Sequence, residues 1–247
     1  MRAALLVLFV ASPAFGQTPA ELDAQCADHS VPTVPSYEPP PWLGDAPPTH
    51  TSAAAASATA RTLRSQLTYN AIQPTLWAQL GDAYRDQCLL GDGGRAVCRS
   101  AASQYSHVIS VQLQNPSTAF PSADVMFFRV AMVDDQIPRS DRVRRTLELL
   151  VSRFPLSALR TSALIFLGRT YEREGNIAAA RDYYEEAAEK PSPEQALALY
   201  LAAWAARAMS DDDDASRFAE QALTTATGQL EQGLRQDWCA LHTPSPG

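Results

Sequence analysis

The sequence has very little lysine: Lys190 is the only one among 20 basic residues, and the others are arginines. The acidic residues number 27, so the formal net charge is −7, and removal of Arg2 with the leader described below makes it one unit more negative. An acidic chain of this kind repels the phosphates of nucleic acids and the headgroups of anionic lipids. We therefore expect no nucleic-acid partner.

The motifs of the common enzyme classes are also absent. There is no G-x-S-x-G nucleophile turn, no phosphate-binding loop, no H-E-x-x-H motif and no glycine-rich dinucleotide turn. Acidic pairs such as Glu185-Glu186 and Asp134-Asp135 occupy adjacent helix positions, so their side chains point about 100° apart and do not converge on one substrate atom. We predict a protein that is not an enzyme and that needs no cofactor.

Long apolar runs are missing except at the start of the chain. The charged start Met1-Arg2, the apolar residues 3–10 and the small residues that follow have the three parts of a secretory signal. We predict a signal peptide at residues 1–16, a mature chain from Gln17 and a location in the periplasm or outside the cell. No later run approaches the ~20 apolar residues of a membrane span. Cys26 lies too far from the apolar run for a lipid anchor, so none is expected.

The chain has only four cysteines, an even number that favours disulfides in an oxidising compartment. Cys88 and Cys98 bracket a Gly-Asp-Gly-Gly insertion, and a bond between them would close a short loop and stabilise the fold by roughly 3 kcal/mol. Cys26 and Cys239 then remain as the second pair. Of the three possible connectivities we favour this one. A metal site is not expected, because no C-x2-C or H-x3-H spacing occurs and the histidines are scattered.

The stretch from residue 164 to residue 187 has the spacing of a helical hairpin. Its first helix carries apolar or small residues at i, i+3, i+4 and i+7, and its second at i, i+4 and i+7. Gly175-Asn176 offers the turn geometry that separates the two helices. We expect small residues to let the helices approach and tyrosines to fill the space beside them. The residues are Leu164, Leu167, Gly168 and Tyr171, followed by Ala180, Tyr184 and Ala187.

Three similar hairpins accompany this one, as they must, because one helix pair cannot bury its apolar face alone. The small residue at the equivalent position of each hairpin is Gly81, Ala131, Gly168 and Ala203 in turn. The successive intervals between them are 50, 37 and 35 residues. We attribute the long first interval to the Gly-Asp-Gly-Gly insertion. The matching residues are Trp77, Leu80, Gly81, Tyr84, Ala101, Tyr105 and Val108 in the first hairpin, Phe127, Val130, Ala131, Val143, Leu147 and Leu150 in the second, and Leu199, Ala202, Ala203, Ala206, Ala215, Ala219 and Ala222 in the fourth.

The pattern resembles the tetratricopeptide repeat (TPR), whose W-x2-L-G-x2-Y element is complete in the first hairpin and begins with Leu164 in the third. The resemblance covers residues 73–228 and implies an all-α fold, a right-handed solenoid of about four helical hairpins. The ending Phe154-Pro155-Leu156-Ser157 is also similar to repeats of exported bacterial envelope proteins. In the second hairpin, Asp134 stands where the aromatic residue of the pattern would be.

Proline is concentrated before the repeats, in residues 17–50, where it favours extended backbone. We predict a strap that crosses the repeats and is pinned by Trp42 and by the Cys26 disulfide. The alternative is a ligand for a proline-recognising partner. We expect the helical repeat domain at residues 51–228, including a capping helix up to Leu67, and a second capping helix with the tail at residues 229–247.

In TPR proteins the first helix of each hairpin lines the inner surface of the solenoid. The faces of these helices that the repeat pattern does not use are therefore the candidate binding groove for a protein partner. Four of the side chains are apolar beyond the needs of repeat packing, which is typical of a contact site. The alternative is that the strap or an end helix covers them. The candidates are Asp82, Arg85, Phe128, Met132, Asp135, Ile165, Arg169, Glu172, Tyr200, Trp204 and Arg207.

Two charged stretches lie within the repeats. Residues 211–214 are four aspartates, which we interpret as the start of a helix near Ala215, where carboxylates favour the helix dipole, rather than as a calcium site. Residues 139–145 contain four arginines, which we interpret as a solvated face, although an acidic partner could dock there.

The function that these observations favour is a non-catalytic periplasmic or secreted TPR adaptor that binds a peptide or helix of a protein partner in its concave groove. The alternative is a structural subunit of an envelope machine, with its groove filled by its own chain and its contacts made by its outer face or its ends. An accessory domain of a cell-wall enzyme ranks lower, because residues 229–247 leave no room for a catalytic domain.

Overall fold

The computed structural model describes residues 17–26, 32–40, 43–69, 73–91, 94–116, 121–137 and 140–242. The predicted signal peptide, Trp42 and Arg139 lie outside them. All regular structure in the described part is helical, in agreement with the predicted fold class. The helices are α1 (Pro19–Asp23), α2 (Ala53–Tyr69), α3 (Pro74–Leu89), α4 (Gly94–Gln114), α5 (Ala123–Asp135), α6 (Ser140–Arg153), α7 (Arg160–Arg173), α8 (Ile177–Ala188), α9 (Gln195–Ala208), α10 (Asp212–Thr225) and α11 (Gly228–His242).

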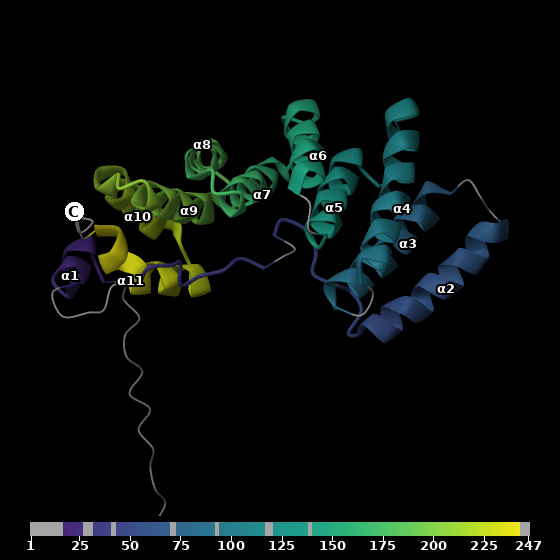
Figure 1. Ribbon diagram of the computed structural model, residues 1–247, viewed down its shortest axis with the longest axis horizontal. Helices are drawn as coiled ribbons and strands as arrows, with labels where there is room; N and C mark the ends of the chain where they lie inside the picture. The colour runs from purple at the N-terminus through teal and green to yellow at the C-terminus, as the bar shows by residue number, and fades with distance from the viewer. Residues whose placement is uncertain are drawn as a thin grey trace, which may run out of the picture.

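Helices that follow one another from α2 onward pack against one another along an elongated array (Figure 1). The pairs α3–α4, α5–α6, α7–α8 and α9–α10 are the four expected hairpins. Helix α2 packs on α3 at one end, and α11 packs on α10 and α9 at the other. The two predicted capping helices are therefore present. Within the part of the chain that the structure describes, no helix has the length and apolar character required to cross a membrane.

The close approach of the helices depends on glycine at two equivalent positions. A Cβ atom built on Gly81 would lie 2.5 Å from the ring of Tyr105, and one on Gly168 would lie 2.3 Å from the ring of Tyr184. Both tyrosine rings are fully buried against the facing helix. The expected pairing of a small residue with a large one is therefore confirmed. Tyr171 instead stacks on Tyr183, with ring centroids 5.3 Å apart.

Replacing Gly168 by alanine should destabilise the protein. The added methyl group would overlap the Tyr184 ring, and overpacking of this kind costs typically 1–3 kcal/mol, less the ~1 kcal/mol that alanine gains over glycine in a helix interior. Urea denaturation monitored by circular dichroism would measure the change. The variant that also carries Tyr184→Leu should recover part of the loss, because the space is then available. Equal losses in the single and double variants would contradict this packing argument.

The extra length of the first repeat is helical, which corrects the sequence interpretation. Helix α3 runs to Leu89 and α4 begins at Gly94, so only residues 90–93 separate the two helices. Helix α4 has 21 residues, whereas α6 has 14. The long first interval thus arises mainly because α4 is longer than its equivalents. The Cys88–Cys98 disulfide joins the end of α3 to the first turns of α4.

Two helix ends follow directly from the local sequence. Gly175 has a φ of +78°, a conformation that glycine adopts without strain, and it ends α7. Asn176 then caps α8 by accepting a hydrogen bond from the backbone N–H of Ala179. In the same way Asp211 caps α10 by accepting from the N–H of Asp214. The aspartate run is therefore a helix start, as predicted, although the helix begins at Asp212 rather than near Ala215.

Candidate functional site

The candidate site is the side of the repeats along which the segment 32–50 runs, which we call the strap. In Figure 1 the strap passes below the hairpins from α11 to the start of α2, so it runs opposite to the order of the repeats. Its side chains Tyr37 and Leu43 pack against the buried core of the array. Hydrogen bonds and ion pairs hold it at α9 and α11, at α7, and at α3 and α5.

An extended segment laid on helices must find partners for its backbone N–H groups, because the helices have used theirs. Proline removes many of these donors, and buried side chains accept from several others. The N–H of Ser36 donates to Asp237 and that of Tyr37 to the Tyr200 hydroxyl oxygen. The N–H groups of Thr49 and His50 both donate to Asp86. The strap is therefore matched to this surface through its backbone.

The first anchor of the strap is the carboxylate of Asp237 on α11, which is completely buried. It accepts hydrogen bonds from the Ser36 N–H at 2.8 Å, the Tyr200 hydroxyl at 2.5 Å and the Trp204 indole N–H at 3.2 Å. The Ser36 hydroxyl also donates to it. Burial, followed by the bond to Asp237, raises the pKa of Tyr200 above its usual value. Tyr200 therefore stays protonated and donates.

The second anchor is Asp45 of the strap, which lies between two arginines of the repeats. Its carboxylate accepts from Arg129 Nε at 2.7 Å and Nη2 at 2.9 Å, and from Arg85 Nη1 at 2.9 Å. The Arg85 and Asp45 side chains are only 2% and 7% exposed. Arg129 also pairs with Asp82 at 2.7 Å, and Asp82 accepts from the Tyr105 hydroxyl. These residues form one largely buried network that joins the strap, α3, α4 and α5.

The two carboxylates of this network have opposite pKa shifts. Burial opposes ionisation of Asp45, but the hydrogen bond and charge of Arg129 and the charge of Arg85 outweigh it, so the pKa of Asp45 is lowered. For Asp82, burial outweighs Arg129 and Tyr105, and the pKa is raised. Of these two carboxylates, Asp45 is thus the one whose charged form the network stabilises.

Asp86 is the centre of the third anchor, where the strap turns into α2. One carboxylate oxygen, Oδ1, accepts from Arg85 at 2.9 and 3.0 Å. The other, Oδ2, accepts from the backbone and hydroxyl of Thr49 and the backbone of His50, and it lies 2.8 Å from His50 Nδ1. The imidazole Nε2 lies 3.1 Å from the Thr59 hydroxyl of α2. The start of α2 is therefore fixed to α3 through one buried carboxylate.

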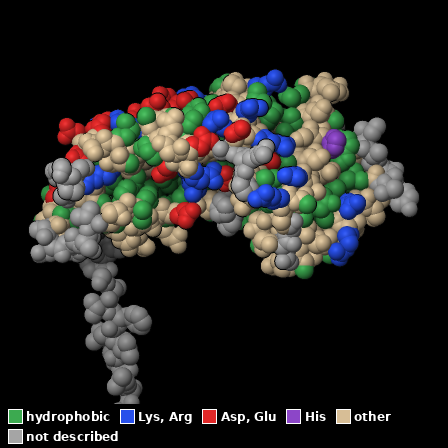
Figure 2. Space-filling view, in the orientation of Figure 1, with side chains coloured by type: hydrophobic (Ala, Val, Ile, Leu, Met, Phe, Trp, Pro, Cys, Tyr) green, Lys and Arg blue, Asp and Glu red, His purple; other side chains and the backbone are tan. Residues whose placement is uncertain are grey.

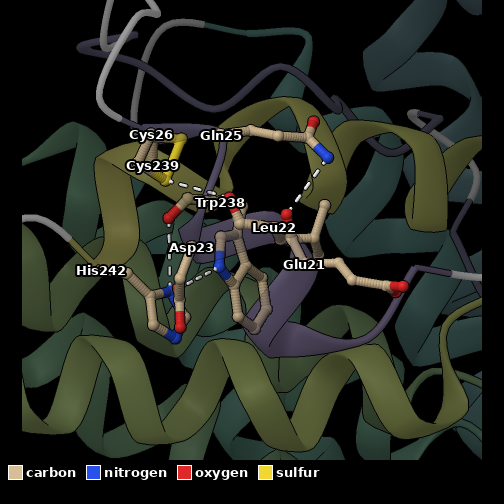
Figure 3. The surroundings of a disulfide bond; sticks show 8 residues. All are labelled: Glu21, Leu22, Asp23, Gln25, Cys26, Trp238, Cys239 and His242. Carbon is tan, nitrogen blue, oxygen red and sulfur yellow. Dashed lines mark hydrogen bonds between the residues drawn. A yellow bond between two sulfur atoms is a disulfide. The ribbon is translucent and has the colours of Figure 1, made fainter.

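A disulfide between Cys26 and Cys239 fixes the segment before the strap to α11, as predicted. Figure 3 shows the same region, in which the indole N–H of Trp238 donates to Asp23 at 2.7 Å and the indole stacks on His242. Trp238 is completely buried. The N-terminal segment and the last helix therefore form one packed unit.

The structure places the predicted groove residues in several different environments. Phe128, Met132 and Ile165 are buried in the core, and Tyr200 and Trp204 are buried and bonded to Asp237. The expectation of an exposed apolar patch is therefore wrong, since these side chains are covered within this chain. The remaining candidates are polar. Asp82 and Arg85 belong to the strap network, Glu172 accepts from the Tyr184 hydroxyl, Arg207 pairs with Asp212, and Asp135 and Arg169 line the hollow described next.

A hollow lies beside the described part of the strap, with a volume of about 570 Å³. Arg169 in it pairs with Glu38 at 3.3 Å, and Glu38 is 85% exposed. Arg173 pairs with Asp135. An exposed pair such as Arg169–Glu38 contributes at most ~1 kcal/mol, so this wall can rearrange. The hollow is lined by Glu38, Pro39, Pro40 and Leu43 of the strap, by Asp135 and Gln136 at the end of α5, and by Phe166, Arg169 and Arg173 of α7.

Sequence reasoning missed four residues that hold the strap: Asp45, Asp86, Arg129 and Asp237. A signal for Asp86 was available, because Asp82, Arg85 and Asp86 fall at i, i+3 and i+4 and form a charged stripe on a helix otherwise suited to packing. Asp45 is one of only two charged residues in the strap as defined here. Nothing in the spacing of Arg129 or Asp237 indicated their partners, which come from segments far away in the chain.

The architecture is that of a TPR-like α-solenoid. The chain is similar to the crystal structure of MamA, with a TM-score of 0.55 and 15% identity over 70% of this chain and 89% of that one. It is also similar to BtubC (BKLC) from P. vanneervenii, with a TM-score of 0.54 and 18% identity over 77% of this chain and 85% of that one. No model of a known protein family matches the chain, and the comparison with curated proteins found no significant match.

Proposed function

We propose that this protein is a non-catalytic scaffold subunit of the cell envelope that fills its concave groove with its own strap and contacts protein partners through its outer face or its ends. The observation that carries the proposal is the strap itself. It contacts α3, α5, α7, α9 and α11, and its backbone N–H groups donate to side chains of α3, α9 and α11. A partner peptide would have to displace a segment tied by a buried ion network and a disulfide.

The proposed location is the periplasm or the outside of the cell. Two disulfides account for all four cysteines. Disulfides of this kind persist in oxidising compartments and are rare in the cytosol. They support the export that the sequence of residues 1–16 predicts. A TPR-like fold without a catalytic motif is compatible with a role in protein association.

A second candidate function is binding of a partner segment in the hollow beside the strap. Its volume of about 570 Å³ lies in the range of ligand sites, which is roughly 300–1,000 Å³. Asp135 and Arg169, two of the predicted groove residues, line it. In this arrangement the strap would form part of the binding surface rather than block it.

Blocking the hollow separates the two candidates. Gln136 is exposed at the rim of the hollow, and Gln136→Trp should fill it without disturbing the core. Gln66→Trp on the exposed side of α2 is the matched control. The mature chain and both variants would be used to capture partners by cross-linking in an envelope extract of the source cells. We expect all three to capture the same protein. If only the Gln136→Trp variant failed to capture the partner, the proposal would be overturned, and binding of the partner in the hollow would be favoured instead.

A further inference from the structure

Charge is distributed unevenly along the repeats. Residues 51–160 contain twelve basic and eight acidic residues, whereas residues 161–225 contain six basic and twelve acidic residues. Residues 74–153, which span the first two hairpins, contain nine basic and eight acidic residues, and the rest of the positive excess comes from Arg61 and Arg64 of α2 and from Arg160. Residues 161–225 carry a net negative charge. Figure 2 shows the same division, with acidic side chains gathered along the upper left edge over α8–α10 and arginines over the centre and right of the molecule. Residues 51–160, which include α2, therefore form a weakly basic half, and residues 161–225 form an acidic half.

Many exposed charges lie on the second helix of each hairpin, on the surface that we call the outer face: the exposed sides of α4, α6, α8 and α10. In Figure 1, α4, α6 and α8 reach the upper edge, whereas the strap runs below the array. The strap therefore leaves the outer face uncovered. On α4 and α6 its exposed charged residues are Arg95, Arg99, Arg142, Arg145 and Arg153 together with Asp141 and Glu148. On α8 and α10 they are Asp182, Asp213 and Glu220 together with Arg217, so basic residues predominate on the first two helices and acidic residues on the last two.

The central charges of this face occupy equivalent repeat positions. Arg145 follows the buried Val143 by two residues, and Asp182 follows the buried Ala180 by two residues. Both side chains therefore point away from the core at the same level of neighbouring hairpins. No ion pair joins either of them to another described residue. Leu149, which is 42% exposed, lies four residues after Arg145 on the same side of α6 and adds an apolar contact.

We propose that the outer face binds a second copy of this chain in a two-fold symmetric dimer. A two-fold axis between α6 and α8 places α6 of each copy against α8 of the other and α4 against α10. Each basic half then faces an acidic half, and Arg145 faces Asp182 of the second copy twice, once on each side of the axis. Such an interface is self-complementary, as a closed two-fold dimer requires. The inference rests on the proposed role of the outer face as the contact surface.

Sedimentation velocity of the mature chain tests the dimer. We expect a dimer that dissociates when salt is raised from about 50 to about 500 mM, because exposed charges are then screened. Arg145→Glu should weaken dimerisation by about tenfold or more, since it places like charges opposite each other, and Asp182→Arg should do the same. Both side chains are exposed, so the fold should persist, which circular dichroism would verify.

The two charge-reversed variants provide a sharp control. Two copies of the same variant place like charges opposite each other and should not pair. In a mixture of the two variants, Glu at position 145 of one chain faces Arg at position 182 of the other, and Asp182 faces Arg145, so a mixed dimer should form. The chain that carries both changes should dimerise with itself again. Arg61→Glu, on the exposed side of α2 and away from the outer face, should leave the dimer unchanged.

A mature chain that remains monomeric up to about 100 μM at low salt, well above the affinity range of specific complexes, would overturn the proposal. A dimer that is insensitive to both reversals would overturn it as well. Neither result bears on the Gln136→Trp capture experiment. Failure of the dimer can therefore be distinguished from failure of the proposed scaffold role.

Discussion

Replacing Asp45 by alanine is expected to lower the free energy of unfolding by about 3–5 kcal/mol, because it leaves Arg85 and Arg129, whose side chains are 2% and 16% exposed, without their shared carboxylate. Arg85 and Arg129 would keep their charges, since the pKa of a guanidinium is far above neutral pH. The side chain of Asp45 is 7% exposed, so water cannot replace the lost oxygen atoms without opening the strap. Chemical denaturation at neutral pH would measure the loss.

Glu38→Ala is the matched control for this prediction, because Glu38 is also a strap carboxylate paired with an arginine. Its side chain is 85% exposed, and an exposed pair contributes at most ~1 kcal/mol. Asp45→Asn should fall between the two, since the amide keeps one acceptor oxygen. If Asp45→Ala cost no more than Glu38→Ala, the buried network would not be what holds the strap.

Removing the Cys26–Cys239 disulfide by a double change to serine is expected to have the largest effect of all the variants described. The sequence separation is 213 residues, for which the chain-entropy relation gives roughly 5 kcal/mol of stabilisation at 25 °C. The bond also closes the contact between the N-terminal segment and α11. We expect the strap to lose its attachment at Asp237 before the repeats unfold.

The Cys88–Cys98 pair provides the comparison within the same chain. Its separation is only 10 residues, for which the same relation gives roughly 3 kcal/mol. Denaturation of both double-serine variants and the parent, under identical conditions, would rank the two bonds. A larger loss for the short loop would show that local strain or structure in the unfolded chain, rather than loop length, decides the contribution of these disulfides.

The strap explains why the inner side of this solenoid carries so many buried polar groups. Asp86 and Asp237 are completely buried, and Arg85 is 1% exposed. Burial of an isolated charge in such a position would lower the stability of the fold. Each of these groups, however, has hydrogen-bond partners in the strap or in a neighbouring helix. Because only a segment with donors and a carboxylate at the right places satisfies all of them, the network selects one register for the strap.

Much of the repeat architecture follows from local sequence. Helix spacing, glycine turns and aspartate caps depend on residues within four positions of one another, so the hairpin built around Gly168 and Tyr184 could be predicted. Pairing of the four cysteines followed from one short loop and elimination. The length of α4 could not be inferred in this way, because the sequence Gly-Asp-Gly-Gly indicates an insertion whether or not the flanking helices are longer than usual.

The sequence alone determined the class of the fold and the number of hairpins, and it favoured the observed disulfide pairs, because helix periodicity is a local property of the chain and four cysteines allow only three pairings. Only the tertiary structure decided that Tyr200 and Trp204 are covered and that Asp45 meets Arg85 and Arg129. These contacts join residues that are 40 to 163 positions apart in the sequence. A periodic pattern relates only residues a few positions apart, so it does not predict such contacts. An extended proline-rich segment has no hydrogen bonds of its own, so its path is set by the side chains on which it lies.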